Sequence, residues 1–308
     1  MTQHGLPRSS AALDWAAAAM GSNARLVAVR RLVGGITSPV HAVTFQQPDG
    51  RRETAVLRRY ASGDAAANAR LIEREARVLD LLQTSGLPAP RLIAADPLGQ
   101  ATGDVPALLM TRLPGHVHLA PADPDGWLRQ VAAILPRIHA VPPVAGVLAR
   151  HYRTLPAATA HMQVPGWSRQ PAAWQAAIDC ARGLRSDAEP YFIHADFHHF
   201  NLLWQRERLT GIVDWEGAGA GPRDADVGHC RLNLAVLFSA EWAERFRLMY
   251  EAEAGRRLDA RWDVAALLRY LPGWGSFIQV QAGRRAKVDL AGMHGRVDEL
   301  MAFAAARL

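Results

Sequence analysis

Three oxygen-bearing side chains lie within one short stretch of the chain and could form a single site. Asp196 and Asn201 are five positions apart, and Asp214 follows thirteen positions after Asn201. Two apolar segments, residues 202–204 and 211–213, flank a short polar link and predict a hairpin. A loop followed by this hairpin would direct all three side chains into one cleft. Carboxylate and amide oxygens suit Mg²⁺ together with a phosphate-bearing substrate, so the spacing indicates phosphate chemistry.

Each of these residues fits one part of a phosphoryl transfer to a hydroxyl group. Such a reaction needs a carboxylate that orients the hydroxyl and accepts its proton, a metal ion that bridges the phosphates, and positive charge. Asp196 can be the carboxylate that faces the hydroxyl. Asn201 can offer its side-chain carbonyl oxygen to Mg²⁺, and Asp214 can bind the ion as a charged ligand. We therefore expect Asp196 to be catalytic and the other two residues to bind the metal.

The composition is that of an ordinary globular enzyme. The chain has 308 residues, enough for one large or two modest domains, and a formal net charge of +6. Its basic residues are scattered among acidic ones, so we expect no nucleic-acid partner. No apolar segment approaches the roughly 18 residues of a membrane span, so we expect no membrane contact. Two cysteines outside any CxxC pattern favour a reducing compartment, and the expected location is cytoplasmic.

The first third of the chain shows short apolar or alternating segments that predict antiparallel strands, together with one long amphipathic helix. Gly86 follows that helix as a stop signal, and Pro114 with Gly115 interrupts the chain after the last strand. We expect a first domain of residues 1–112, formed by a five-stranded antiparallel sheet and a helix. The expected strands are residues 26–33, 40–45, 54–57, 92–95 and 107–111, and the expected helix is residues 64–83.

Beyond residue 113 the helical period dominates, and only the hairpin around Asp196 and Asp214 interrupts it. We expect a second, mostly helical domain of residues 113–308 and an α+β fold class for the chain. The expected helices are residues 127–139, 172–183, 226–238, 240–253, 264–270 and 297–308.

HADFHHFNLLW (residues 194–204) and GIVDWE (residues 211–216) resemble the catalytic loop and the metal-binding segment of the aminoglycoside phosphotransferase family. These are small-molecule kinases with the protein-kinase-like fold, and the resemblance covers nearly the whole chain. It implies a two-lobed fold with a nucleotide-binding lobe at residues 1–112 and a helical catalytic and substrate-binding lobe at residues 113–308. It further implies O-phosphorylation of a small hydroxylated acceptor, an antibiotic or a metabolite, with ATP or GTP and Mg²⁺, by a monomer or homodimer.

The same resemblance assigns further residues to the site. GGITS resembles the nucleotide-covering loop, and ALLMTRLPG resembles the hinge that meets the adenine, with Met110 as gatekeeper. Glu75 stands where the family has its ion-pairing glutamate. The implied nucleotide-binding residues are Gly34, Gly35, Thr37, Ser38, Arg58, Glu75, Met110, Thr111 and Leu113. His194 and Asp226 would support the catalytic loop.

Two positions depart from the family pattern. In AVLRRY, Arg58 replaces the phosphate-binding lysine, and the only lysine of the chain, Lys287, lies far downstream. Arginine supplies charge and can bind phosphate oxygens in a bidentate way, but its planar group is bulkier than an ammonium. This departure leaves open a degenerate kinase that binds nucleotide with little or no turnover. The second departure is His199–Phe200, where the family often has Pro-Gly.

A metal-dependent hydrolase is a further alternative. Imidazole and carboxylate groups are zinc ligands, and four residues offer them here: His194, Asp196, His198 and His199. Their spacing matches no zinc signature, and a zinc site would leave Asn201 and Asp214 without a role.

The acceptor site has weaker signals. Residues 269–277, RYLPGWGSF, are the better pocket candidate, because proline and glycine break a helix beside aromatic residues. A polycationic acceptor would require an acidic pocket. Four glutamates can supply one or can form a solvated helix face: Glu241, Glu244, Glu251 and Glu253.

Overall fold

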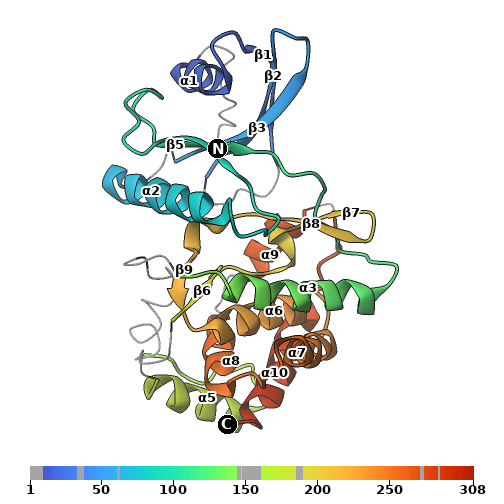
Figure 1. Cartoon of the computed structure of the whole chain (residues 1–308). Coiled ribbons are helices and arrows are strands. Elements are labelled where there is room, and N and C mark those ends of the chain that lie inside the picture. Colours follow the sequence, from blue (N-terminus) through green and yellow to red (C-terminus); the bar gives the residue numbers. More distant parts are fainter. Residues whose placement is uncertain are drawn as a thin grey trace. The chain divides into compact units, whose positions relative to one another are not determined.

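The computed structural model describes residues 10–32, 38–60, 63–143, 147, 161–184, 190–270, 274–283 and 285–308. The chain divides into two compact units, Met1–Pro114 and Gly115–Leu308 (Figure 1). The first unit holds a five-stranded antiparallel sheet with helices, and the second unit is mostly helical. The predicted α+β fold class is therefore confirmed. The functional assignment of the two predicted domains stays a prediction.

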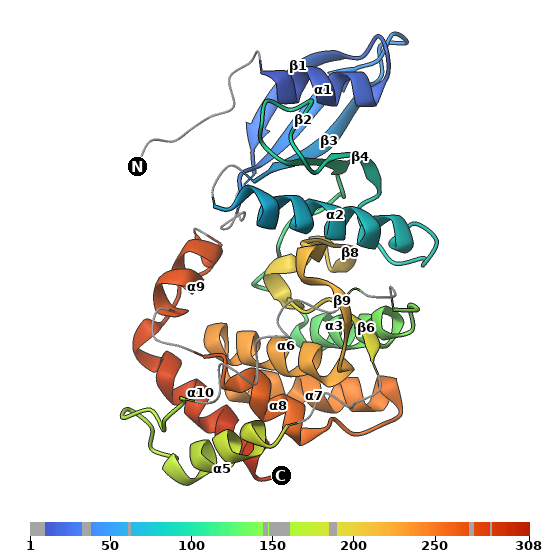
Figure 2. The same cartoon turned by 90° about the vertical axis from the view of Figure 1, so that its left-hand side faces the viewer.

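The sheet of the first unit has the strand order β1-β2-β3-β5-β4, with antiparallel neighbours throughout (Figures 1 and 2). Helix α1 (Ala11–Met20) packs on one face, where Leu13 joins a core with Phe45 and Leu57. Successive side chains of a strand point to opposite faces, so the alternation that buries Leu57 beside α1 turns Arg58 to the other face. The strands are β1 (Arg25–Arg31), β2 (Val40–Gln46), β3 (Arg52–Arg59), β4 (Leu92–Asp96) and β5 (Ala107–Thr111).

Helix α2 (Ala65–Leu82) begins after Asp64, whose carboxylate accepts hydrogen bonds from two backbone N–H groups of the first turn. Apolar residues at helical spacing, such as Ile72 and Leu79, form its buried face. Glu75 lies among these buried residues and is only 1% exposed. Because an unpaired charge is rarely buried, this carboxylate needs a cationic partner.

Helix α6 (Arg223–Leu237) is the centre of the second unit, since nearly all of its residues are buried. It packs against α7, α8 and α10, and α5 packs against α8 and α10 (Figure 2). The helices around α6 are α3 (Pro124–His139), α5 (Pro171–Arg182), α7 (Ala240–Ala254), α8 (Ala260–Leu267), α9 (Trp274–Ala282) and α10 (Leu290–Ala305).

Two small sheets hold the polar stretch that the sequence singled out. Strands β7 (Leu202–Gln205) and β8 (Arg208–Ile212) form the predicted hairpin. Strand β6 (Tyr191–Ile193) pairs with β9 (Gly219–Gly221), and this pair was not predicted. Three-residue strands, one of them made of glycine and alanine, carry no periodic signal. Two single-turn 3₁₀ helices, His199–Asn201 and Trp215–Gly217, lie in the loops that these strands frame.

Helices α8, α9 and α10 differ most from the predictions, while α3 and α6 each begin three residues earlier than predicted. Helix α9 was not predicted, because its sequence WGSFIQVQA begins with glycine and aromatic residues and shows no clear amphipathic face. Helices α8 and α10 begin earlier than predicted. Asp259 and Asp289 act as their N-caps, and each accepts a backbone hydrogen bond from the first turn. No helix among the described residues is long and apolar enough to cross a membrane.

Candidate active site

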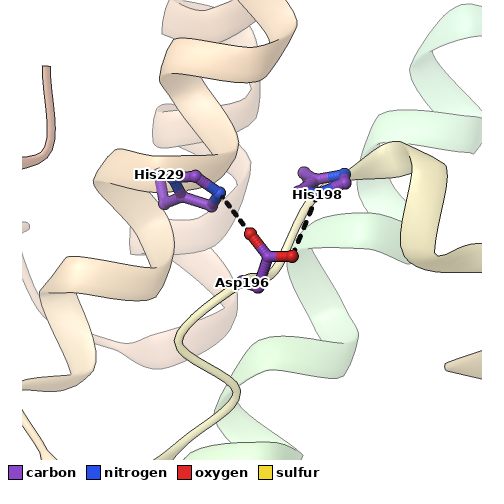
Figure 3. A group of neighbouring side chains, drawn as sticks. All are labelled: Asp196, His198 and His229. Atoms are coloured by element: carbon purple, nitrogen blue, oxygen red, sulfur yellow. Dashed lines mark hydrogen bonds and ion pairs between the residues drawn. The ribbon is translucent and has the colours of Figure 1, made fainter. Parts of the chain in front are cut away.

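Asp196 lies in the loop after β6, where histidines from two elements flank its carboxylate (Figure 3). His229, on α6, places its Nε2 3.0 Å from Asp196 Oδ1. His198 places its Nε2 3.5 Å from Asp196 Oδ2. The Asp196 side chain is 32% exposed, whereas those of His198 and His229 are 3% and 5% exposed. A substrate can therefore reach the carboxylate but not the imidazoles.

The second nitrogen of each imidazole accepts a hydrogen bond, and this assigns the tautomers. The backbone N–H of Phe200 donates to Nδ1 of His198 at 3.2 Å. A guanidinium N–H of Arg269 donates to Nδ1 of His229 at 3.3 Å. Both Nε2 atoms therefore carry the hydrogen that faces Asp196. This arrangement favours the ionised carboxylate.

The charge states at the site follow from burial and from these contacts. Burial alone would raise the pKa of the Asp196 carboxyl, but interactions with His198 and His229 outweigh it and hold that pKa well below its ordinary value. Burial, and secondly the charge of Arg269, lower the pKa of His229 to about 4. Near neutral pH, Asp196 is an anion beside a neutral His229.

Asp226 and His194 hold the loop that carries Asp196. The two oxygens of Asp226 accept hydrogen bonds from the backbone N–H groups of His194 and Ala195, at 2.8 and 2.7 Å. Nε2 of His194 donates to the carbonyl oxygen of Val213 at 3.0 Å, and its Nδ1 accepts from the N–H of Asp196 at 3.3 Å. Burial lowers the pKa of His194, so a neutral ring with one donor and one acceptor fits both contacts. The loop is thus tied to α6 and to the end of the β7–β8 hairpin.

Two residues of the site have a left-handed backbone conformation. The φ angles are 64° at Ala195 and 69° at Asp214. This region costs a residue with a Cβ roughly 1–2 kcal/mol and persists where the surrounding structure imposes it. The backbone hydrogen bond to Asp226 is such a constraint at Ala195. Strain of this kind is common at functional sites.

Asn201 and Asp214 are brought together by the hairpin. The Nδ2 of Asn201 donates to the carbonyl oxygen of Asp196 at 2.9 Å and to its Oδ2 at 3.2 Å, which turns Oδ1 away from that carboxylate. The N–H of Val213 donates to the carbonyl oxygen of Asn201 at 2.9 Å, so the chain next to Asp214 runs beside Asn201. An amide oxygen and a carboxylate fit Mg²⁺, which binds through one or two protein oxygens and keeps several waters.

In the first unit, Arg58 and Glu75 form a buried ion pair. The Arg58 guanidinium lies 2.9 and 3.1 Å from the two Glu75 oxygens, and the side chains are 5% and 1% exposed. The Arg58 Nε donates to Ser38 Oγ at 2.9 Å, and the guanidinium stacks over the ring of Tyr60 at 5.5 Å. Arg58 therefore places a positive charge where the family pattern has lysine, and it pairs with Glu75, the expected glutamate.

The remaining predicted nucleotide-binding residues lie on or after β5, or outside the described part of the chain. Met110 is buried in β5 opposite Val56 of β3. Thr111 ends that strand, and its hydroxyl accepts a hydrogen bond from the N–H of Arg91 at 2.8 Å. Leu113 is half-buried. Three predicted residues lie outside the described residues: Gly34, Gly35 and Thr37.

Residues 29–273 match the phosphotransferase enzyme family. The chain belongs to this family. The resemblance to aminoglycoside phosphotransferases is thereby confirmed, and so is the enzyme class, a phosphotransferase with an alcohol group as acceptor. A comparison with curated proteins gave no match.

Solved structures of the same fold agree with this family assignment. A Ralstonia eutropha JMP134 protein assigned as an aminoglycoside phosphotransferase is 16% identical, with a TM-score of 0.64 over 96% of this chain and 98% of that one. A thermostable mutant of aminoglycoside phosphotransferase APH(4)-Ia, in a ternary complex with ADP and hygromycin B, is 18% identical, with a TM-score of 0.56 over 90% and 94% of the chains. The amicoumacin kinase hAmiN, in complex with AMP-PNP, Ca²⁺ and Ami, is 17% identical, with a TM-score of 0.56 over 89% of this chain and 87% of that one. At these identities the likeness shows the fold.

The geometry of this phosphotransferase does not support the alternative of a zinc cluster. Among the described residues, the side chains that can share a metal are Asp196, His198 and His229, with ligand atoms within 4.8 Å of one another. His194 instead donates to the carbonyl oxygen of Val213, and the buried ring of His199 packs at a tilt against Phe200, with ring centroids 4.4 Å apart. A metal bound to Nε2 of His198 or His229 would move the ring hydrogen to Nδ1. There it would face the N–H group of Phe200 or Arg269, so two donors would oppose each other.

Sequence reasoning missed two residues of the site, His229 and Arg269. His229 follows Asp226 by three positions on α6, so the two share a helix face. Once Asp226 was expected to support the catalytic loop, this spacing could have indicated His229 as well. Arg269 reaches His229 only through the packing of the segment after α8, and its sequence context carries no signal for that contact.

Proposed function

We propose that this phosphotransferase moves the γ-phosphoryl group of ATP or GTP to a hydroxyl group of a small molecule in a Mg²⁺-dependent reaction. The observation that carries the proposal is the Asp196 carboxylate: it is held by two imidazole N–H groups, ionised near neutral pH and still a third exposed. A carboxylate in this state can accept a hydrogen bond from an acceptor hydroxyl and take its proton in the transition state.

The proposed step balances as a direct displacement. The acceptor oxygen attacks the γ-phosphorus, and its bond to phosphorus forms as the bond from that phosphorus to the β,γ-bridging oxygen breaks. The nucleoside diphosphate leaves with the bridging oxygen. The hydroxyl proton passes to Asp196. The buried Nε2–H groups of His198 and His229 keep the carboxylate oriented throughout.

The expected ligands of the metal are Asn201 and Asp214, on the two sides of the β7–β8 hairpin. When bound, Mg²⁺ would neutralise charge on the nucleotide phosphates. In the first unit, the proposed phosphate contact is Arg58, held by Glu75 and Ser38. The proposed nucleotide-covering loop contains Gly34, Gly35 and Thr37, and the proposed adenine contacts are Met110, Thr111 and Leu113.

The acceptor is proposed to be a hydroxylated antibiotic or metabolite. Support comes from the structures of similar fold, whose complexes hold hygromycin B in one case and Ami in another, with ADP or AMP-PNP. We propose that the enzyme acts in the cytoplasm, as a monomer or homodimer.

An acceptor screen tests the proposal. Purified enzyme with ATP or GTP and Mg²⁺ is offered aminoglycosides, other antibiotics, amino alcohols and sugars, and both nucleoside diphosphate and phosphorylated product are measured. We expect nucleotide consumption that an acceptor stimulates and that chelation abolishes until Mg²⁺ is restored. Tight nucleotide binding without product across the panel would instead indicate a degenerate kinase. Activity restored by zinc and not by Mg²⁺ would indicate a hydrolase.

A further inference from the structure

The second unit contains a cavity of about 530 Å³ whose lining includes the aromatic rings of Trp167, Trp174 and Tyr270. This volume falls within the range of small-molecule sites. Trp174 comes from α5, Tyr270 follows α8, Gly275 belongs to α9 and His294 belongs to α10. Trp167, from the segment before α5, stacks on His294 at 4.4 Å between ring centroids and meets Trp174 edge to face at 5.4 Å. Five parts of the chain thus converge on one cavity.

The cavity wall is held in place by hydrogen bonds to Asp298, which does not itself line the cavity. Asp298 of α10 is only 5% exposed. Its carboxylate accepts hydrogen bonds from Trp174 Nε1 at 2.9 Å, from Ser168 Oγ at 2.6 Å and from the N–H of Arg169 at 2.8 Å. These contacts fix the segment that follows Trp167. The indole N–H of Trp174 is thereby satisfied, and ring surface is left to face the cavity.

One wall of the cavity is linked to Asp196 through two hydrogen bonds. Leu268 and Tyr270 line the cavity, and Arg269 lies between them in the chain. The Arg269 guanidinium donates to His229 Nδ1, and His229 Nε2 donates to Asp196 Oδ1. The segment that shapes the cavity therefore also fixes the histidine that orients Asp196.

Charge argues against a polycationic occupant. None of the described residues that line the cavity is an aspartate or a glutamate. Two of the four glutamates of α7 form ion pairs: Glu244 with Arg231, Arg247 and Arg307, and Glu251 with Arg247 at 2.8 Å. The other two, Glu241 and Glu253, are exposed and do not line the cavity. A polycation would find no opposite charge in the wall. A flat apolar group would find ring faces and edges.

We propose that this cavity binds the acceptor through a planar, apolar part of the molecule, so that the substrate class is a hydroxylated compound with an aromatic or similarly flat group. The inference rests on the proposed phosphoryl transfer, because it assigns the cavity to the acceptor of that reaction. Trp167 and His294 supply the stacking surface, and Asp298 holds it in position.

Binding and turnover of two probes test the proposal. The first probe is 2-naphthylmethanol, a flat hydroxylated compound, and the second is hygromycin B, a polycationic one. Calorimetry with the full chain and Mg-ADP should show binding of 2-naphthylmethanol. Trp167→Ala should weaken that binding about tenfold or more, as expected for a lost apolar contact in a small-molecule site. Trp167→Phe keeps a flat ring and should restore most of it.

Two further variants on α10 provide a second test and a control. His294→Ala changes an exposed residue of α10 and should also weaken binding of 2-naphthylmethanol, through loss of the stacking partner. Phe303, on the same helix, is 39% exposed. Phe303→Ala removes this aromatic ring and should leave binding of 2-naphthylmethanol unchanged. Melting curves of all variants identify any that fail to fold.

The outcomes separate this inference from the proposed function. Phosphorylation of hygromycin B with a KM that Trp167→Ala leaves unchanged, together with no binding of 2-naphthylmethanol, would overturn the inference and leave the proposed function standing. Binding of 2-naphthylmethanol that depends on Trp167, with no phosphoryl transfer to any acceptor, would overturn the proposed function and with it the role of acceptor site. A KM for flat acceptors that rises in Trp167→Ala, with little change in kcat, is the expected result.

Discussion

At the scale of single residues, the site combines one accessible carboxylate with buried imidazoles that hold it in place. Asp196 is reachable, while His198, His229 and His194 are buried around it and make hydrogen bonds that leave each ring in one tautomer. A carboxylate that kept its charge but lost this support would rotate freely. In the proposed reaction the imidazoles are positioning residues, and the carboxylate is the group that meets the substrate.

The role of Arg58, which stands where the family has lysine, can be tested by comparing it with Arg59 on the opposite face of β3. Arg58→Ala should raise the KM for nucleotide about tenfold or more, because a charge-assisted phosphate contact is lost. It should also lower the free energy of unfolding by about 3–5 kcal/mol, because Glu75 would stay buried without Arg58. Steady-state kinetics and urea unfolding measure the two effects.

Arg59→Ala is the matched control, because Arg59 lies on the opposite face of the same strand. We expect its nucleotide KM to stay close to that of the wild type. Equal losses in the two variants would show that the assignment of Arg58 to the phosphate site is wrong.

The buried His229 predicts a stability loss on acidification. Its pKa is lowered from 6.5 to about 4 in the folded state. The unfolded chain therefore binds more protons between these two values, so stability is full above pH 6.5 and falls as the pH drops toward 4. The contribution is on the order of 3 kcal/mol. His229→Gln, which keeps a side-chain N–H donor but does not titrate, should flatten the pH dependence of the urea midpoint in this window. An unchanged slope would contradict the neutral state assigned to His229.

The sequence could predict some of these residues and not others. Asp196, Asn201 and Asp214 share one motif, so their type and spacing were sufficient to place them near one another. The Arg58–Glu75 contact could be expected from the family pattern. The contact from Arg269 to His229 could not, because it joins positions 40 apart through packing of α6 and the end of α8. The tautomers of His198 and His229 could not be predicted either, because they depend on hydrogen bonds from Phe200 and Arg269 that arise only from the folded structure.

At the scale of secondary-structure elements, α6 holds the loop that carries Asp196. It supplies Asp226 to the loop backbone and His229 to Asp196. Its neighbour α8 approaches closely at Gly228, where an added Cβ would lie 2.7 Å from the Cβ of Ala266 and 3.1 Å from the Cα of Asp263. The absence of a side chain at Gly228 therefore sets the distance between the two helices.

Alanine substitution in helices α6 and α10 tests this close approach. Gly228→Ala should destabilise the protein by about 1–3 kcal/mol through overpacking, and it should lower kcat because it shifts the next residue, His229. Gly295→Ala is the control, since no atom lies within 4 Å of its added Cβ. That change should stabilise the protein by about 0.5–1 kcal/mol through helix propensity alone. Unfolding in urea distinguishes the two, and stabilisation by both substitutions would contradict the packing described.

The elements themselves were predicted unequally. The five strands of the first unit and helix α2 have clear periodic patterns, and the structure has them within a few residues of the predicted bounds. Strands β6 and β9 are too short for a pattern, and β9 consists only of glycine and alanine. Helix α9 was missed because Pro272 and Gly273 before it, and Gly275 within it, are signals for a turn. Packing against the rest of the unit overrides such local signals.

At the scale of the whole molecule, each unit carries part of the proposed reaction. The first unit supplies the Arg58–Glu75 pair, and the second supplies Asp196, the hairpin and the aromatic cavity. A nucleotide that binds the folded protein stabilises it by mass action. If Asn201 and Asp214 bind Mg²⁺ as proposed, the stabilisation by nucleotide should depend on Mg²⁺.

Thermal unfolding measures this dependence. At an ATP concentration of about 100 times the dissociation constant, Mg²⁺ and ATP together should stabilise the protein by about 2.7 kcal/mol. Chelation should remove most of that gain, and Asp214→Asn should weaken it in the presence of Mg²⁺. Asp179→Asn, an exposed change on α5, should have the wild-type response. An equal gain with and without Mg²⁺ would contradict the metal site.

The central claim is that Asp196 receives the proton of an acceptor hydroxyl during phosphoryl transfer. The most direct measurement is the rate of labelled γ-phosphoryl transfer from ATP to an acceptor found in the screen, in the wild type and in Asp196→Asn, alongside the nucleotide dissociation constant of each. We predict a loss of roughly 10²–10⁴-fold in kcat with nucleotide affinity nearly unchanged. A variant that transfers the phosphoryl group at close to the wild-type rate would contradict the account.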